Sequence, residues 1–440
     1  MRFRKPTKVV KDGLVTFYDY DDNGKTIKKI VATVVLPNNA KATSSSLATM
    51  SKATLKTEAT STQVISFTYN DKGQRTSSTQ PNGGSSSSIY DDNGNQVKSI
   101  SPLGFTTETL SFDKAGRALE TKSFDGKISS TEYDNMGRVL SSTRDGQTTT
   151  NEYDNLGRNI KTTYADGRVQ EKKYDTNGNV IESWNNQGDK SKSYYDVNNN
   201  LVKSETYKDN ILTNSNQTEY DRKNRVIANI DAQGNRSTYT YNSKGQQTET
   251  KDALNRVTKS IYNAKGQLAQ TINPDGKATT YTYNSDGQRT EVETPNGATF
   301  KFAYDSLQRV TEKNNPDRGT TTYTYDVSGN IVTETNAKGE TKTYSYDIAN
   351  RKTSTSYDDA TLNESYEYDN GANAKGKLTK ITDASGSMEF AYDVNGNLAS
   401  KTQTIANQRF TTSYTYDEHD RMTTSQILAL KKSLEIIKGE

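Results

Sequence analysis

A motif of about 21 residues recurs along most of this chain. Each copy starts at an aromatic anchor that is followed by Asp or Asn and, usually, by a Gly a few residues later. The seventeen anchors are Tyr69, Tyr90, Phe112, Tyr133, Tyr153, Tyr174, Tyr195, Tyr220, Tyr241, Tyr262, Tyr283, Tyr304, Tyr325, Tyr346, Tyr368, Tyr392 and Tyr416. Successive anchors are 20 to 22 residues apart, except for a gap of 25 before Tyr220 and gaps of 24 before the last two anchors. Self-similarity at a fixed period indicates a repeat architecture rather than a set of ordinary globular domains.

The pattern inside each copy favours β-structure over helix. Aromatic residues alternate before the anchor, as in Tyr239 and Tyr241 or Tyr323 and Tyr325, and a spacing of two places both rings on one face of a strand. A turn such as Asp326–Gly329 follows, and an aliphatic residue often stands six residues past the anchor. A second turn, often Asn-Gly or Asp-Gly, closes the copy. Each copy therefore predicts two short strands and two turns.

Joined end to end, these copies predict an all-β fold, a continuous antiparallel β-hairpin ribbon. Because strands twist and sheet edges need cover, such a ribbon is expected to curl into a spiral, barrel or shell. We expect residues 63–425 to form this ribbon of about 17 copies. Residues 1–37 are expected to be an N-terminal segment with one isolated copy at Tyr20, and residues 38–62, rich in Ser, Thr and Ala, a linker or degenerate repeat.

The pattern changes in residues 426–440. Apolar residues there fall at helical spacing and predict a short amphipathic helix; they are Ile427, Leu430, Leu434 and Ile437. Three interpretations remain open for this tail: an end cap over the last strand, a truncated end, and a partner-binding helix.

Bulk composition excludes several classes of protein. Only 30% of residues are hydrophobic, which favours disorder, but a net charge of +3 and 28 tyrosines argue against it. The balanced charge gives no reason to expect nucleic acid or an anionic membrane as partner. No apolar run is long enough to span a bilayer, and the chain has no Cys for disulfides or thiolate metal sites. No apolar segment follows the basic N-terminus, so we expect export without a conventional signal peptide, or a fragment of a larger exported protein.

Residues that could carry chemistry are few. The one histidine, His419, stands in the last turn, and we interpret it as a surface turn residue. The segment Asp19–Gly24 begins like a calcium loop, but Ile30 replaces the bidentate Glu, so turn chemistry is the favoured interpretation. We therefore predict no catalytic residues, no metal site and no cofactor.

The aromatic rows are the main candidate site. We predict that they form a structural seam between copies, with the alternative that some of them stack on sugars. The seam residues are Tyr133, Tyr153, Tyr174, Tyr239, Tyr241, Tyr281, Tyr283, Phe302, Tyr304, Tyr323, Tyr325, Tyr344 and Tyr346. Base stacking is not expected, because no basic stripe accompanies the rings.

Copies such as Tyr133–Val139 and Tyr153–Arg158 resemble the YD repeat of the Rhs family. That family includes bacterial Rhs polymorphic toxins, shell subunits of insecticidal Tc toxin complexes, wall-associated proteins and teneurins. The resemblance covers about residues 65–425 and implies a complete or partial hollow β-shell, with the aromatic face lining its interior. In the toxin members the shell encloses a cytotoxic domain, which a core domain with Asp-Pro motifs frees by self-cleavage. No Asp-Pro follows Tyr416 here, so that cleavage is not expected.

Two functional hypotheses follow, and a third has little support. The first is a noncatalytic shell of a secreted or delivered toxin-like Rhs protein, which sequesters a polypeptide toxin cargo and contacts other toxin-complex subunits. The second is a cell-surface adhesion or carbohydrate-binding protein with glycans as partners. The third is an enzyme built on the array, for which no active-site residue can be named.

Overall fold

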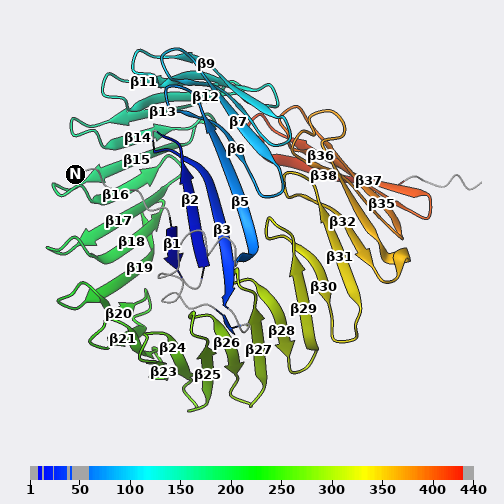
Figure 1. Cartoon of the computed structure of the whole chain (residues 1–440). Coiled ribbons are helices and arrows are strands. Elements are labelled where there is room, and N and C mark those ends of the chain that lie inside the picture. The colour runs from blue at the N-terminus through cyan, green and yellow to red at the C-terminus, as the bar shows by residue number, and fades with distance from the viewer. Residues whose placement is uncertain (1–7, 12–13, 23, 37–39, 42–58, 430–440) are drawn as a thin grey trace, which may run out of the picture. The chain divides into compact units, whose positions relative to one another are not determined.

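The computed structural model describes residues 8–11, 14–22, 24–36, 40–41 and 59–429 (Figure 1). These residues form 38 β-strands and one short 3-10 helix, η1 (Ala360–Leu362). The chain divides into two compact units, which are described separately. Unit 1 comprises residues 1–110, 121–127 and 302–440, and unit 2 comprises residues 111–120 and 128–301. The predicted all-β, antiparallel hairpin ribbon is confirmed.

The strands that begin in the first 127 residues are β1 (Lys8–Lys11), β2 (Leu14–Tyr20), β3 (Thr26–Leu36), β4 (Ala40–Lys41), β5 (Ala59–Tyr69), β6 (Arg75–Thr79), β7 (Ser85–Tyr90), β8 (Gln96–Ile100), β9 (Thr106–Phe112) and β10 (Ala118–Lys122).

The next strands are β11 (Ile128–Tyr133), β12 (Val139–Arg144), β13 (Gln147–Tyr153), β14 (Asn159–Thr163), β15 (Val169–Tyr174), β16 (Val180–Asn185), β17 (Asp189–Tyr195), β18 (Leu201–Lys208), β19 (Ile211–Tyr220), β20 (Val226–Ile230), β21 (Arg236–Tyr241), β22 (Gln247–Lys251), β23 (Val257–Tyr262), β24 (Leu268–Ile272), β25 (Ala278–Tyr283), β26 (Arg289–Glu293) and β27 (Thr299–Tyr304).

The remaining strands are β28 (Val310–Asn315), β29 (Gly319–Tyr325), β30 (Ile331–Thr335), β31 (Thr341–Tyr346), β32 (Lys352–Tyr357), β33 (Glu364–Tyr368), β34 (Leu378–Asp383), β35 (Gly386–Tyr392), β36 (Leu398–Ile405), β37 (Gln408–Tyr416) and β38 (Met422–Ala429).

Each copy opens with a hairpin whose register is set at the anchor. In β11–β12, Tyr133 pairs with Val139, and the register shifts between Glu132 and Tyr133. The same anchor-to-sixth-residue pairing and the same shift recur in other copies, for example at Tyr174 and Val180. Directly opposed residues of an antiparallel pair share a face. The aliphatic residue therefore lies beside the anchor ring, and a β-bulge follows it in the second strand.

The turn inside this hairpin explains the Asp and Gly of the motif. In the copy at Tyr153, the N–H of Gly157 donates to the carbonyl of Asp154 at 2.9 Å, and Gly157 has a φ of 83°. That left-handed conformation favours Gly, and Asn tolerates it better than most residues. Asn199, Asn224 and Asn350 take the same place in copies without the Gly, with φ between 58° and 63°.

The N-terminal copy at Tyr20 is not isolated. Its second strand, β3, pairs with β5 from Lys28↔Ser66 to Val34↔Ala59, which places this copy directly beside the first copy of the array. Within the expected linker 38–62, residues 40–41 form β4 and residues 59–62 belong to β5. The difference arises because the exposed edge of β3 offers unpaired backbone groups to a segment whose composition resembles a loop. The rest of that linker lies outside the described residues.

The C-terminal prediction is corrected at its start. Residues 426–429, assigned to the helical tail, belong to β38, in which Gln426 pairs with Ser413 and Ile427 with Thr412. Pairing with β37 satisfies their backbone groups and outweighs the helical spacing of the side chains. Residues 430–440 of the predicted helix lie outside the described residues.

Very little of the molecule is fully buried. Among the residues whose burial is described, the buried hydrophobic side chains are Phe17, Ala228 and Ala374, and most other strand residues are half-buried. The described part of the chain contains no helix with the length and apolarity that a membrane crossing needs. The fold is therefore held by contacts along the ribbon rather than by a central core.

Candidate functional site

In most copies, a hydrogen bond from the anchor tyrosine joins the copy to the one before it. The hydroxyl donates to the carbonyl of the residue that pairs with the preceding anchor, at 2.5 to 3.1 Å. The tyrosines that do so are Tyr69, Tyr90, Tyr153, Tyr174, Tyr195, Tyr220, Tyr241, Tyr262, Tyr283, Tyr325, Tyr346, Tyr368, Tyr392 and Tyr416. Tyr69 bonds in this way to Thr26, so the copy at Tyr20 belongs to the same series.

The aspartate after the anchor holds the turn. In the copy at Tyr153, Asp154 Oδ1 accepts from the N–H of Arg158 at 2.9 Å, and its Oδ2 accepts from Arg158 Nε at 2.7 Å. The backbone N–H of Arg158, aided by its guanidinium, lowers the pKa of Asp154 against the opposing effect of desolvation. The same contacts from Arg421 lower the pKa of Asp417 to about 2. These carboxylates are therefore charged at neutral pH and serve as turn caps.

A cation five residues past the anchor reaches forward to the next copy. Arg158 lies over the ring of Tyr174 at 4.7 Å from its centroid, and its Nη1 donates to the carbonyl of Asp175 at 2.9 Å. Arginines in the same position lie 4.4 to 4.7 Å from the next anchor ring; they are Arg117, Arg138, Arg225, Arg309 and Arg351. The tyrosine, aspartate and arginine of successive copies form what we call the inter-repeat ladder.

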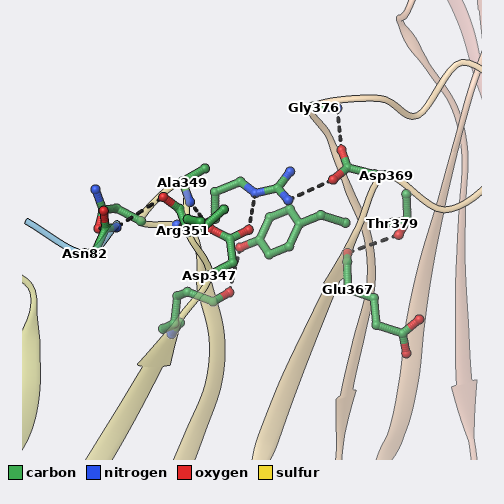
Figure 2. Close-up of polar contacts among 12 residues, drawn as sticks. Asn82, Asp347, Ala349, Arg351, Glu367, Asp369, Gly376 and Thr379 are labelled. Atoms are coloured by element: carbon green, nitrogen blue, oxygen red, sulfur yellow. Dashed lines mark hydrogen bonds and ion pairs between the residues drawn. The ribbon is translucent and has the colours of Figure 1, made fainter. Parts of the chain in front are cut away.

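Figure 2 shows this arrangement around Arg351. Its Nε donates to Asp347 Oδ2 at 2.7 Å in its own turn, and its Nη2 donates to Asp369 Oδ2 at 2.8 Å in the next turn. Asp369 also accepts from the N–H of Gly376, which closes a longer turn in that copy. One guanidinium thus bridges two carboxylates while it covers the ring of Tyr368.

The structure divides the predicted seam residues into two groups. The anchors with described contacts join adjacent copies: Tyr133 lies under Arg117, and Tyr153, Tyr174, Tyr241, Tyr283, Tyr325 and Tyr346 make the hydroxyl bonds above. The upstream rings have other partners: Tyr239 bonds Asn229, Tyr344 bonds Glu334, and Tyr281 lies near Arg289. Burial raises the pKa of Tyr323, and Phe302 and Tyr304 are half-buried.

Sequence reasoning did not identify the arginine of the ladder. Its signal was present, because Arg stands five residues past the anchors Phe112, Tyr133, Tyr153, Tyr220, Tyr304, Tyr346 and Tyr416. His419 lies in the last turn as predicted, but its side chain is only 17% exposed. Asp21, in the segment that begins like a calcium loop, accepts from the N–H of Lys25 at 2.7 Å, as the other turn aspartates do.

A second polar cluster lies on the face opposite the anchors. Glu205, 8% exposed, accepts from the hydroxyls of Tyr194 at 2.9 Å and Tyr207 at 2.7 Å, and pairs with Lys203 at 2.7 Å. The hydrogen bonds from Lys203, Tyr207 and Tyr194 lower the pKa of Glu205 to about 2. The bond to Glu205 raises the pKa of Tyr207 to about 12. Tyr194 precedes the anchor Tyr195, and adjacent strand residues point to opposite faces.

Comparison with known proteins gives the family and the fold. Residues 34–184 and 185–317 match the model of the teneurin YD-shell, and residues 304–341 and 373–406 match the RHS repeat. A crystal structure of TcdB2-TccC3-Cdc42 has a TM-score of 0.62 at 15% identity, over 94% of this chain and 27% of that chain. TcdB2-TccC3 without its hypervariable C-terminal region gives 0.62 at 15%, over 96% and 27%. The chain thus spans about a quarter of the length of these relatives.

A search of curated proteins gave no match. The family match and the structural similarity together confirm the YD-shell fold that the repeat motif predicted.

The ladder predicts unequal effects for two substitutions at one junction. Tyr174→Phe keeps the ring under Arg158 but removes the 2.7 Å bond to the Asn159 carbonyl, so we expect a loss of about 1 kcal/mol. Arg158→Ala removes the ion pair, the bond to Asp175 and the ring contact, so we expect it to lower the stability of the junction more than Tyr174→Phe does. Hydrogen exchange of β15 and β16 amides measures both, because repeat arrays open locally. Tyr164→Phe, at an exposed ring, is the control; an equal effect there would contradict the ladder.

The Glu205 cluster predicts a loss of stability in acid. Because folding lowers the pKa of Glu205, its carboxylate stabilises the fold above the ordinary value of about 4.3, and this contribution disappears as pH falls toward 2. We expect the difference in urea midpoint between the wild type and Glu205→Gln to be largest near pH 6 and to shrink at pH 3. Exposed Glu312→Gln should show no such trend. A pH-independent difference for Glu205→Gln contradicts the assignment.

Proposed function

The chain belongs to the YD-shell family, and from this premise we propose that it is a noncatalytic wall segment of a toxin-like RHS protein that sequesters a polypeptide cargo. Its action would be physical. A hydrogen-bonded wall would keep the cargo away from water, proteases and the producing cell.

The inter-repeat ladder is the observation that carries this proposal. It ties copy to copy through hydroxyl–carbonyl bonds and arginine contacts, and the described residues bury only three hydrophobic side chains. A ribbon stabilised along its length can be one sheet thick and still persist. Such a ribbon suits a wall better than it suits a compact domain with an internal active site.

The proposed partners follow from the same role. They are a polypeptide toxin cargo and other subunits of a toxin complex, with the chain acting outside the producing cell or at its surface. A crystal structure of TcdB2-TccC3 has a similar fold, with a TM-score of 0.51 at 15% identity, which supports a multi-subunit setting for proteins of this fold.

The wall function predicts protection of an attached polypeptide. An unfolded, trypsin-sensitive reporter fused after Glu440 of the full chain should be cleaved several-fold more slowly than the free reporter. The matched control is the same fusion carrying Arg158→Ala and Arg225→Ala, which weakens two ladder junctions and should speed reporter cleavage. Cleavage of the reporter at the free rate in the folded fusion would overturn the proposal.

A groove around Trp184 favours carbohydrate binding as a second candidate function. The groove has a volume of about 480 Å³ and is lined by Trp184 together with Glu182, Asn185, Asp189 and Lys190. An aromatic ring beside carboxylate and amide groups can stack on a sugar and bond its hydroxyls. The polar groups are also engaged with one another, since Asn185 donates to Asp189 at 2.8 Å, so a glycan would have to displace these bonds.

The single tryptophan makes this candidate directly measurable. If glycans bind in the groove, titration should change the fluorescence of Trp184, the only Trp in the chain, with saturation. Trp184→Phe should abolish the signal, and Asp189→Asn should weaken the apparent affinity. Unchanged fluorescence across a panel of neutral and acidic oligosaccharides removes this candidate.

A further inference from the structure

Within unit 1, side chains near the start of the array contact turns near its end. Gln63 Nε2 donates to the carbonyl of Val327 at 3.1 Å. Asn82 Nδ2 donates to the carbonyl of Ile348 and to Asn350 Oδ1, each at 3.1 Å. Asn82 is labelled in Figure 2. Lys127 Nζ donates to the carbonyl of Asn395 at 3.2 Å.

A pair of aromatic rings near the start of the array adds a fourth connection, because the pair lies against a turn near the end of the array. The rings of Phe105 and Phe124 stack with centroids 5.2 Å apart. A Cβ atom at Gly376 would lie 3.6 Å from Phe124 and 4.0 Å from Phe105, so both rings lie against the turn that contains Gly376.

These contacts follow one rule. The three hydrogen-bonded contacts join residues 264 to 268 positions apart. The turn that closes the copy at Tyr69 meets the first turn of the copy at Tyr346, and the turn that closes the copy at Phe112 meets that of Tyr392. Both pairs are thirteen anchors apart. Two rows of turns therefore meet in register, and Gln63, in β5, reaches one further turn at Val327. We call this meeting line the clasp.

Gly84 shows that the approach at the clasp is close. It is buried, and its backbone is not in the left-handed region that explains most glycines of this chain. A Cβ atom at Gly84 would lie 2.7 Å from the carbonyl oxygen of Ile348, on the opposite row. Glycine is needed here because the facing turn leaves no room for a side chain.

The clasp differs physically from the strand ladders on either side of it. Its three hydrogen-bonded contacts use side chains that water can reach, so water can replace each partner when the rows separate. The strand pairings described next to it run within each row, as in β6–β7, β7–β8 and β31–β32. Separation of the rows would therefore break few interactions and leave the hairpins on both sides intact.

We infer that the clasp is an opening device of unit 1: the two rows of turns separate and rejoin while the β-ladders of each row stay formed. In a wall that holds a polypeptide, such a line would be a route for passage. The inference itself concerns the movement of the rows and does not depend on the cargo, so it can be tested apart from the proposed function.

The test uses a reporter crosslink in the full chain, which has no native Cys. Asn82→Cys combined with Asn350→Cys should form a disulfide under mild oxidation, while either single variant should not. Adding Gly84→Ala forces the rows apart and should slow crosslinking by about five- to thirtyfold, the change in a two-state ratio that corresponds to about one to two kcal/mol. Adding Gly83→Ala instead controls for strain within the turn, because its φ of +87° disfavours Ala but nothing lies within 4 Å of its added Cβ, so crosslinking should stay nearer the parent rate.

Hydrogen exchange distinguishes opening from unfolding. In the Gly84→Ala variant, the backbone amides that pair β7 with β8 and β31 with β32 should keep wild-type protection against exchange while crosslinking slows. Three outcomes overturn the inference: no crosslink in the parent pair, an unchanged rate with Gly84→Ala, or loss of ladder protection together with the crosslink. The last would mean that the clasp and the hairpins open as one unit.

Discussion

The bond from the anchor tyrosine to the preceding copy is the interaction on which the rest of the structure depends. Its acceptor is the carbonyl of the residue that pairs with the previous anchor, directly before a β-bulge. A bulge disrupts the ladder locally and leaves backbone groups in need of a partner. The tyrosine hydroxyl supplies that partner from the next copy. The same feature that bends the hairpin therefore also ties it to its neighbour.

This arrangement explains how a chain with so little hydrophobic sequence can fold. A chain with so few hydrophobic residues cannot bury enough apolar surface in a single core to offset the conformational entropy that it loses on folding. Here most junctions repeat a hydroxyl bond and a capped turn, and several add an arginine over a ring. Each contribution is about 1 kcal/mol or less, but neighbouring copies add their contributions along the array. Stability thus grows with copy number rather than with the size of a core.

The sequence predicted the periodic part of the fold because periodicity reports local geometry. The alternation of Tyr239 and Tyr241 and the Asp and Gly of each turn depend on nearby backbone conformation. The ends were predicted less well. Residues 59–62 and 426–429 look like linker and helix in isolation, and they become strands because a neighbouring edge offers them backbone partners. The Glu205 cluster was missed for a related reason, since Tyr194 and Tyr207 reach it only once the strands are in register.

The clasp could not be predicted at all from the motif, and the reason lies in its acceptors. Gln63, Asn82 and Lys127 have different side chains, yet each donates to a backbone carbonyl of a first turn. Every copy presents such a carbonyl, so the contact partner is chosen by the offset of thirteen copies and not by the identity of the facing residue. Two features do depend on residue identity: Asn82 also donates to Asn350 Oδ1, and Gly84 must stay small where the Ile348 carbonyl approaches. Other substitutions in the facing turns should therefore retain the backbone-carbonyl contacts of the clasp, provided that the number of copies between the two rows stays fixed.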